Sequence, residues 1–384
     1  MTTTARVLAA IAVILLATGG ETLHAQGAAS TAVPFLLISP GARASAMGET
    51  GVATADDASA IFWNPAGLGF QKGMELGLSH SNWLPQFQQS DLFFEYANFK
   101  MAMPEINGTI GAALTFLNLG EFERRDEANN LLGRFKSFEV AFTGSYGTQI
   151  DEDLALGVGL HVIHSSLSQL GTAQETGSGT ATAVAADLGI LYRPSKFLLP
   201  FTDEEIGDHF AIGLAFSNMG PSITYIDEQQ SDPLPTTLRL GLAIDLVKEE
   251  YNRLTWSTDV TKLIIRREDK KADNFFTALT KNNYFNWNSY TLGTGIEYWY
   301  SDFVALRFGF FHEDPQWGNR RFLTFGAGVR YEIYGFDFSY ISTDISNERS
   351  PLADTLRFTL SILWDRAKTP PDDGTRIPAD DSKN

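Results

Sequence analysis

The stretch TLRLGLAIDL, Thr237 to Leu246, shows the pattern that decides the fold. Large apolar side chains occupy every second position, and small or charged residues fill the positions between them: Leu238, Leu240, Leu242, Ile244 and Leu246 alternate with Arg239, Gly241, Ala243 and Asp245. Successive side chains of a β-strand point to opposite faces of the sheet. The alternation therefore predicts a strand with one apolar face and one face of small and charged residues.

Three further stretches repeat this alternation, at Leu154–Ile163, Phe210–Ser217 and Leu356–Trp364. A soluble β-sandwich also alternates, but its outward face is expected to be frankly charged. In this chain the face opposite the large apolar residues carries mostly Gly, Ala, Ser and Thr, with occasional charges. Such a face suits the lumen of a membrane barrel that leaves room for a plug, while the apolar face meets lipid.

Runs of this kind recur along most of the chain. Fourteen are found: 73–80, 91–101, 109–119, 136–147, 154–166, 180–192, 209–218, 236–246, 252–261, 289–299, 303–312, 321–331, 335–341 and 355–364. An even number lets the sheet close with both ends on one side, as in outer-membrane barrels. The sequence thus predicts an all-β fold: a 14-stranded antiparallel transmembrane β-barrel over residues 73–364, preceded by a short plug-like segment over residues 26–72.

The predicted connections differ in length between the two sides of the barrel. Those after even-numbered strands are short, as at Asp151–Asp153 and Tyr300–Asp302, and those after odd-numbered strands are long, as at Gly120–Phe135 and Lys262–Asn288. Outer-membrane barrels have short periplasmic turns and longer extracellular loops, so the short turns are expected in the periplasm. Arg193–Asp208 breaks the rule, because it is long but falls on the short-turn side.

The two ends of the chain are expected to lie outside the barrel. Arg6 precedes an apolar run, Val7–Thr18, which is followed by two glycines and by the small residue Ala25. This layout predicts a secretory signal peptide over residues 1–25. Residues 365–384 are rich in proline and charge and predict a disordered periplasmic tail. An exported barrel places the protein in the bacterial outer membrane, with lipid as a partner.

Composition and motifs exclude several classes of function. The formal net charge of -17 argues against nucleic acid as a partner. The chain has no cysteine, and it shows no phosphate loop, nucleophile elbow or zinc-binding helix. His161 and His164 are three positions apart on a predicted strand, so they face opposite ways and do not chelate together. We therefore expect no enzyme activity, no cofactor and no metal site.

The predicted lumen face carries charges of both signs. The central set is Arg239, Asp245, Asp259, Glu297, Arg307, Arg330, Asp337 and Arg357, and Glu75, Glu139, Asp187 and Arg253 share the face. Buried charges need partners. One interpretation is an interior salt-bridge network that braces the plug or the wall, and the other is a polar conduit for a substrate.

The stretch RASAMGETGVATADDASAIFWNPAGL, Arg43 to Leu68, precedes the predicted strands. Pro65 fixes its own φ angle, and the Asn64 side chain can accept a hydrogen bond from nearby backbone as an Asx turn. The acidic pair Asp56-Asp57 is placed to cap a helix that begins near Ala58 or to meet Arg43. These small and capping residues mainly shape backbone, so the stretch predicts a compact segment that folds inward and partly occludes the barrel.

The stretch Gly41–Leu68 resembles the N-terminal signature of the PorV/PorQ family of outer-membrane proteins, which is itself similar to FadL-type fatty-acid transporters. The matching residues are Arg43, Met47-Gly48, Gly51-Val52-Ala53, Asp56-Asp57 and Trp63-Asn64-Pro65-Ala66. The resemblance implies a type IX secretion component whose outward loops bind the C-terminal domains of exported cargo or subunits of the secretion machinery. Gly67-Leu68 departs from the PorV branch, where a Lys-Tyr-like pair usually follows, and agrees with FadL-like proteins.

Three classes of function stay open at this point. The first is a secretion adaptor that recognises proteins through its long loops. The alternative is a FadL-like transporter of hydrophobic small molecules, which predicts an apolar cavity bounded by Arg43–Leu68 and a gap in the wall. The third is an outer-membrane enzyme such as a lipid deacylase, for which the sequence offers no catalytic constellation.

Overall fold

The computed structural model describes residues 31–364 apart from 88–90, 126–127, 169–178, 198–206, 226–230, 266, 269–270, 274, 283, 285 and 344–350. The predicted signal peptide and tail lie outside the described residues, as does most of the long connection after Tyr192. Among the residues that the structure describes, no helix has the length and apolar character needed to cross a bilayer.

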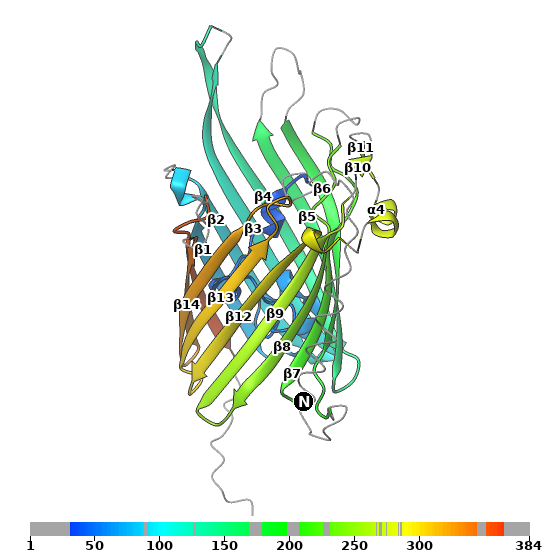
Figure 1. Ribbon diagram of the computed structural model, residues 1–384, viewed down its shortest axis with the longest axis vertical. Helices are drawn as coiled ribbons and strands as arrows, with labels where there is room; N and C mark the ends of the chain where they lie inside the picture. The colour runs from blue at the N-terminus through cyan, green and yellow to red at the C-terminus, as the bar shows by residue number, and fades with distance from the viewer. Residues whose placement is uncertain are drawn as a thin grey trace, which may run out of the picture.

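A closed antiparallel barrel forms the body of the molecule (Figure 1). Its wall consists of β1 (Met74–Asn82), β2 (Phe93–Met103), β3 (Gly108–Arg125), β4 (Leu131–Gln149), β5 (Leu154–Ser168), β6 (Gly179–Tyr192), β7 (Phe210–Met219), β8 (Thr237–Lys248), β9 (Asn252–Leu263), β12 (Tyr290–Tyr300), β13 (Val304–Glu313), β14 (Arg321–Tyr331), β15 (Tyr334–Ser342) and β16 (Leu356–Trp364). Each strand pairs with its neighbours in the chain, and β1 closes the ring on β16. The prediction of a 14-stranded barrel is confirmed.

The alternation that predicted the strands separates an outer face from a lumen face. On β8, Leu240 is 52% exposed while Arg239 beside it is 5% exposed. Exposed apolar side chains recur around the outside of the wall, for example Leu160 on β5 and Leu306 on β13. In a membrane barrel the outer face contacts the acyl chains of the bilayer. The apolar side chains that are exposed on the outside of this wall are therefore the ones that contact lipid.

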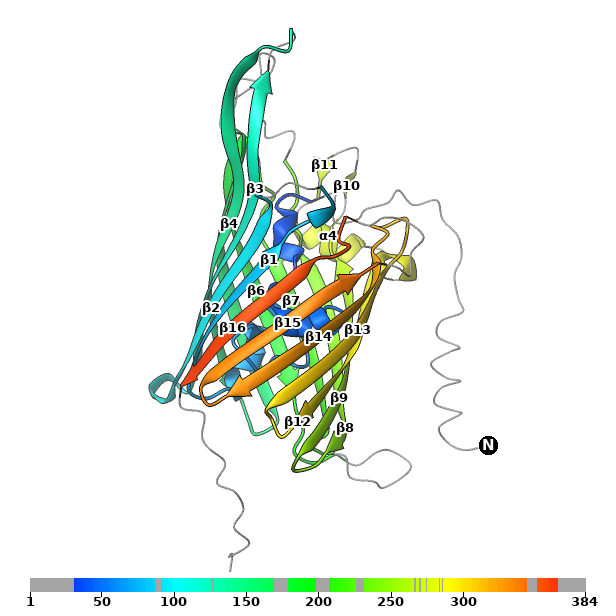
Figure 2. The ribbon, with the colours of Figure 1, turned by 90° about the vertical axis from the view of Figure 1, so that its left-hand side faces the viewer.

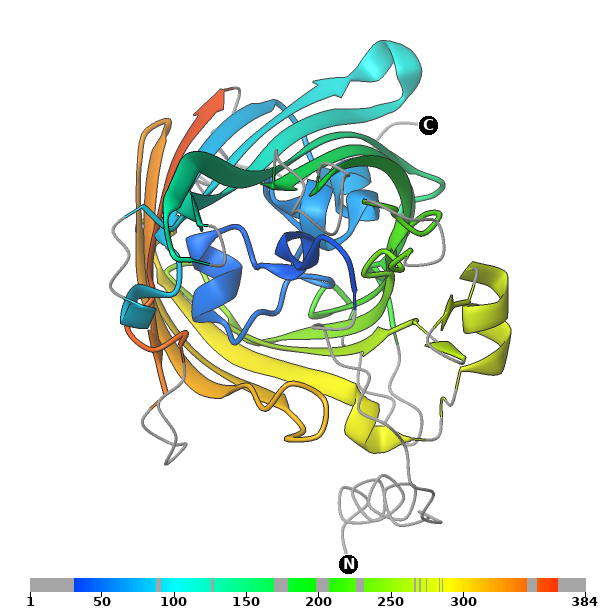
Figure 3. The same ribbon diagram turned by 90° about the horizontal axis from the view of Figure 1, so that it is seen from above.

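The long-loop end carries structure that the alternation did not predict. β3 and β4 continue beyond their neighbours as a hairpin that projects from the barrel (Figure 2). Between β9 and β12 the chain leaves the wall and forms a small sheet, β10 (Arg267–Glu268) with β11 (Lys271–Ala272), the helix α4 (Phe275–Lys281) and the turn η7 (Trp287–Ser289). Figure 3 shows α4 outside the ring of strands.

Residues 31–72, which we call the inner segment, lie within the ring of strands (Figure 3). Its short helices are η2 (Pro34–Leu37), α2 (Ala42–Ala46), α3 (Ala60–Trp63) and η3 (Pro65–Phe70). The segment joins β1 at the short-turn end, as the strand parity predicted. Its first part lies at the opposite end, because Ala32 N donates to Pro233 O, 3.0 Å away, in the long β7–β8 connection. The segment therefore runs the length of the lumen.

Glycines in the wall make room for the inner segment. A Cβ atom on Gly157 of β5 would lie 2.1 Å from the Pro65 carbonyl carbon, and one on Gly309 of β13 would lie 2.0 Å from Gly48 N. Similar close approaches to the segment occur at eight further wall glycines: Gly111, Gly147, Gly189, Gly213, Gly241, Gly293, Gly295 and Gly326. The small residues that the sequence places on the lumen face are thus the surface against which the backbone of the inner segment packs.

Candidate functional site

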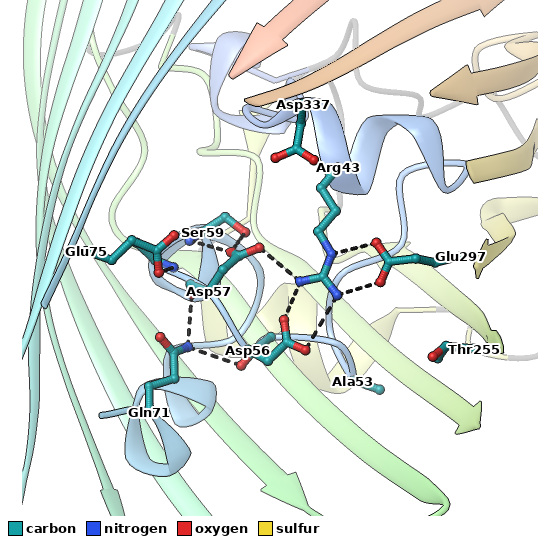
Figure 4. A network of polar contacts seen from close by, with 12 residues as sticks. Arg43, Ala53, Asp56, Asp57, Ser59, Gln71, Glu75, Thr255, Glu297 and Asp337 are labelled. Atoms are coloured by element: carbon teal, nitrogen blue, oxygen red, sulfur yellow. Dashed lines mark hydrogen bonds and ion pairs between the residues drawn. The ribbon is translucent and has the colours of Figure 1, made fainter. Parts of the chain in front are cut away.

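The candidate site is an ion-pair network between the inner segment and the wall, and Arg43 on α2 is its centre (Figure 4). Arg43 Nε and Nη2 donate to the two carboxylate oxygens of Glu297 on β12, at 2.9 and 2.8 Å. Arg43 Nη1 also donates to Asp56, and to Asp57 Oδ2 at 3.1 Å. Such a bidentate arginine–carboxylate pair fixes orientation as well as charge.

The network continues from Glu297 along the wall. Arg307 of β13 donates to Glu297 at 2.6 Å and to Asp337 of β15 at 2.8 Å. Arg330 of β14 donates to Asp337 at 2.6 Å. The guanidinium groups of Arg307 and Arg330 also lie over the Trp299 ring, at 5.5 and 5.4 Å from its centroid. Four wall charges predicted for the lumen are therefore paired with one another and joined to the segment.

The acidic pair of the segment meets Arg43, which is one of the two roles predicted for it. Helix α3 begins at Ala60, and its N-cap Ser59 makes no side-chain cap. Asp57 Oδ1 accepts from Ser59 N at 2.8 Å, before the helix. Burial opposes ionisation of Asp56, but Arg43 outweighs that effect, so the pKa of Asp56 lies below its ordinary value. The pair serves as the counter-charge of Arg43.

A second carboxylate holds the backbone of the segment. Asp259 Oδ2 on β9 accepts from Gly51 N at 2.7 Å and from Val52 N at 3.0 Å, and the Asp259 side chain is 3% exposed. Beside it, Thr50 Oγ1 and Ser257 Oγ are 2.6 Å apart. Two backbone donors thus hold one oxygen of this buried carboxylate and fix the segment backbone against β9.

The Asn-Pro-Ala motif ties the segment to itself and to β6. Asn64, which is fully buried, donates from Nδ2 to Val52 O at 3.1 Å and to Ile190 O at 3.0 Å. Its Oδ1 accepts from Ala66 N at 3.1 Å, which is the predicted Asx arrangement, and Pro65 starts η3. Because a shorter or longer side chain cannot make all three bonds, the motif specifies this turn.

Met47 and Gly48 fit the segment against β12, β13 and β14. Gly48 has φ +70°, and a Cβ atom there would lie 2.4 Å from Phe310 O and 2.5 Å from Thr294 O. Gly48 N donates to Thr324 Oγ1 at 3.0 Å. Only glycine tolerates both that backbone conformation and that approach.

Other predicted lumen charges lie apart from the Arg43 network. Arg357 donates to Ser45 Oγ on α2, and Arg239 lies over Phe62 and Trp63 at 5.3 and 5.6 Å. Asp245 is only half-buried and accepts from Thr255 Oγ1 at 2.6 Å, near the short-turn mouth. Among the residues that the structure describes, these wall charges therefore make several separate contacts.

Sequence reasoning missed the buried charge of Lys100, but it did predict that His161 and His164 face opposite ways. Lys100 on β2 is 5% exposed and donates to Lys72 O at 2.8 Å, and it lies directly opposite Glu75 in the β1–β2 register. His161 faces the lumen, where Nε2 and Asp187 Oδ2 are 2.7 Å apart, whereas His164 faces outward and contacts Thr182. Glu75 and Lys100 carry opposite charges at inward positions of adjacent strands, and this pattern could have predicted their proximity.

Cavities inside the described lumen are small. One of about 70 Å³ lies among Leu37, Glu49, Arg239, Glu313 and other residues, and two of about 20 Å³ each adjoin Arg43 and His161. A wider space of about 280 Å³ opens at the short-turn mouth beside Arg193 and Lys248. The site is therefore a clamp that holds the segment in the lumen.

Comparisons with known proteins identify the family that this chain resembles. A family model described as type IX secretion system protein PorV matches residues 22–269. Among solved structures, the toluene transporter TodX of P. putida is similar over 84% of this chain and 98% of its own, with 13% identity and a TM-score of 0.50. A FadL homologue of Pseudomonas aeruginosa is similar over 85% of this chain and 98% of its own, with 11% identity and a TM-score of 0.46. No curated protein matches in sequence.

Proposed function

The chain belongs to the PorV family of type IX secretion proteins, and from this premise we propose that it binds exported cargo, or subunits of the secretion machinery, through its long-loop end. The protein is an outer-membrane barrel of that family. Exported C-terminal domains are the partners that the family resemblance implies. The observation that carries the proposal is that the lumen is filled while the long-loop end projects.

The projecting β3–β4 hairpin supports this proposal. Pairing of β3 with β2 stops at Asn118, and pairing with β4 continues to Arg125. An irregularity after Asn118 places Gly120 opposite the buried Ser137. Because alternate residues share a face, the next pair on that lumen side is Phe122 with Phe135.

Those two rings are available at the long-loop end. Phe122 and Phe135 stack with centroids 5.9 Å apart, and Phe122 is 42% exposed. The opposite face carries an ion pair, Glu123 with Arg134 at 3.1 Å. An exposed aromatic pair beside the mouth is the type of anchor that protein interfaces use.

The alternative, transport of a hydrophobic small molecule, finds less support. It requires an apolar cavity beside Arg43–Leu68, and pockets for drug-sized ligands measure about 300–1,000 Å³. Three cavities beside this stretch hold about 70, 20 and 20 Å³, and Glu49, Arg239, Glu297 and other charged residues line them. The wider space of about 280 Å³ at the short-turn mouth also adjoins the stretch, but its lining is charged, with Arg43, Asp56 and Arg193 among it. The likeness to TodX concerns the fold alone. Because the clamped segment fills the lumen, transport through the barrel would require that segment to move.

A pull-down from outer membranes in detergent tests the proposal. We expect the full chain to capture exported proteins or machinery subunits, and the double substitution Phe122→Ser, Phe135→Ser to reduce capture about tenfold, since buried aromatic anchors are worth about 2 kcal/mol or more. The matched control, Glu123→Ser with Arg134→Ser on the other face of the same hairpin, should retain capture. Failure of the unchanged protein to capture any such partner would contradict the proposal.

A further inference from the structure

The cavity of about 70 Å³ lies where the inner segment approaches the long-loop end of the wall, and neither the Arg43 network nor the β3–β4 hairpin uses it (Figure 3). The inner segment contributes Leu37, Glu49 and Trp63 to its lining. Trp317 and Arg320, from the connection between β13 and β14, contribute as well, and both are half-buried. Because that connection lies on the long-loop side, the cavity opens toward the long-loop mouth.

Arg239 on β8, which also lines this cavity, is a buried cation without an anionic partner. It is 5% exposed, and within the part of the chain that the structure describes it forms no ion pair. It donates to Ser217 Oγ at 3.4 Å and lies over the rings of Phe62 and Trp63. Arg307, by contrast, contacts two carboxylates at 2.6 and 2.8 Å. Since a buried guanidinium without a carboxylate is destabilising, the cavity beside Arg239 is suited to an anion.

Glu49 gives the same cavity an unpaired charge of the opposite sign. It is half-buried, and none of the described residues donates a hydrogen bond to its carboxylate or forms an ion pair with it. Glu313, the other carboxylate of the lining, accepts from Arg320 Nε and Nη2 at 2.7 and 3.1 Å. Of the charged residues that line this cavity, Arg239 and Glu49 are thus the ones without an ion pair.

Two buried polar atoms of the lining also lack a hydrogen-bond partner, Thr237 Oγ1 and Trp63 Nε1. Thr237 is 1% exposed and Trp63 is 4% exposed. Thr237 shares the lumen face of β8 with Arg239, because alternate residues of a strand point the same way. The Trp63 ring lies 5.6 Å from the Arg239 guanidinium. Buried donors without partners are destabilising, so the Arg239 side of the cavity favours a ligand with acceptor oxygens.

The volume of the cavity limits the ligand to a small molecule. A cavity needs about 10–15 Å³ to hold one water molecule, so the volume of about 70 Å³ holds about five to seven groups of that size. Alanine has about this number of non-hydrogen atoms. The cavity therefore accommodates a small amino acid but not a drug-sized compound.

The charges of the lining select among small anions. Phosphate and sulfate would bring a second negative charge close to Glu49 and Glu313, and like charges repel. A monocarboxylate that also carries an ammonium group provides a partner for both Arg239 and Glu49. An α-amino acid has these two groups, and a guanidinium binds a carboxylate through two parallel hydrogen bonds.

We propose that this cavity binds a small free α-amino acid, with its carboxylate on Arg239 and its ammonium group on Glu49. Thr237 donates its hydroxyl to the carboxylate. The bound amino acid links the inner segment to the wall, because Glu49 belongs to the segment and Arg239 to β8. The site does not involve the β3–β4 hairpin, so this binding is independent of cargo capture.

Binding of tritiated alanine to the purified full chain in detergent tests the site. We expect saturable binding that unlabelled alanine displaces. Alaninamide lacks the carboxylate and N-acetylalanine lacks the ammonium group, so each should displace the label about tenfold less well. Absence of saturable binding would overturn the proposal. Displacement by N-acetylalanine that equals displacement by alanine would overturn the free amino acid as the ligand and assign the cavity to the C-terminal residue of a polypeptide.

Substitutions separate a binding role from a structural one. Because the Thr237 hydroxyl has no partner in the structure, Thr237→Val should leave the Tm unchanged and weaken alanine binding severalfold. The matched control is Thr109→Val, which should lower the Tm and keep alanine binding, since the buried Thr109 donates to Gln71 O at 3.1 Å at the short-turn end.

Arg239→Met should lower the affinity for alanine about tenfold or more, because the carboxylate loses its cation. A heat-dependent gel shift verifies that each variant forms the closed barrel. Equal affinity for alanine in the unchanged chain, Arg239→Met and Thr237→Val would overturn the assignment of the site.

Discussion

The lumen and the long-loop end use similar side chains in opposite ways. In the lumen, aromatic and charged groups pack against one another and are buried. Trp299, for example, is 6% exposed and lies beneath two arginines of the ion-pair network. At the long-loop end, Phe122 and Phe276 are 42% and 74% exposed. The difference indicates that the side chains of the lumen hold the inner segment in place, and it supports our proposal that recognition takes place outside the lumen.

The largest expected effect comes from breaking the clamp at Arg43. Arg43→Met leaves Glu297 without one of its two cations, and removing one partner of a buried pair costs about 3–5 kcal/mol. We expect the lower end of that range because the Arg43 side chain is 19% exposed. Thermal unfolding followed by circular dichroism measures the loss.

The control for this change is an exposed pair at the short-turn mouth. Arg253 and Asp302 are 3.5 Å apart, with side chains 40% and 64% exposed. Arg253→Met should cost less than about 1 kcal/mol, as exposed pairs do. An equal loss in both variants would show that the lumen network is no stronger than a surface contact.

Filling the seat of the segment is the next largest change. A side chain on Gly157 would meet the Pro65 backbone, so Gly157→Val should destabilise the folded barrel by about 1–3 kcal/mol or displace the segment. Gly144 on the neighbouring strand has nothing within 4 Å of an added Cβ. Gly144→Val is thus the matched control, and limited proteolysis of the inner segment should increase only in Gly157→Val.

Acid should weaken the clamp slightly. The folded pKa of Asp56 lies below its ordinary value of 3.8, so the stability that this carboxylate contributes is present above about pH 4 and is lost as the pH falls below it. The Asp56 side chain is 42% exposed, which limits the contribution to under about 1 kcal/mol. The difference in Tm between the unchanged chain and Asp56→Asn should shrink between pH 5 and about pH 3. A constant difference would contradict this role.

The wall was predictable because lipid and lumen impose a strict period of two on every strand. The small side chains on the lumen face also predicted that a segment of the chain occupies the lumen. Contact with Arg43 was one of the two roles predicted for Asp56-Asp57. The pairing of Glu297 with Arg307 required the register of β12 with β13, which composition does not give. Lys100 escaped notice because apolar residues on both faces of β2 conceal its alternation.

Two further features depended on tertiary contacts. Strand parity fixes where the inner segment joins β1, but it does not fix the path before that point, and the Ala32 contact with Pro233 reveals that path. The connection between β9 and β12, which contains α4, was predicted only as a long loop. Its helix is short, and its position against the wall depends on Lys262, whose ammonium group lies over the rings of Tyr284 and Tyr290.

Locking the inner segment to the wall tests the central claim most directly. The chain has no cysteine, and Thr50 Oγ1 lies 2.6 Å from Ser257 Oγ, so Thr50→Cys with Ser257→Cys can form a single disulfide between segment and β9. Capture of exported proteins or machinery subunits is then measured in oxidised and reduced samples. Our account predicts equal capture in both states, because the long-loop end binds while the lumen stays shut. Loss of capture on oxidation, restored by reduction, would contradict it.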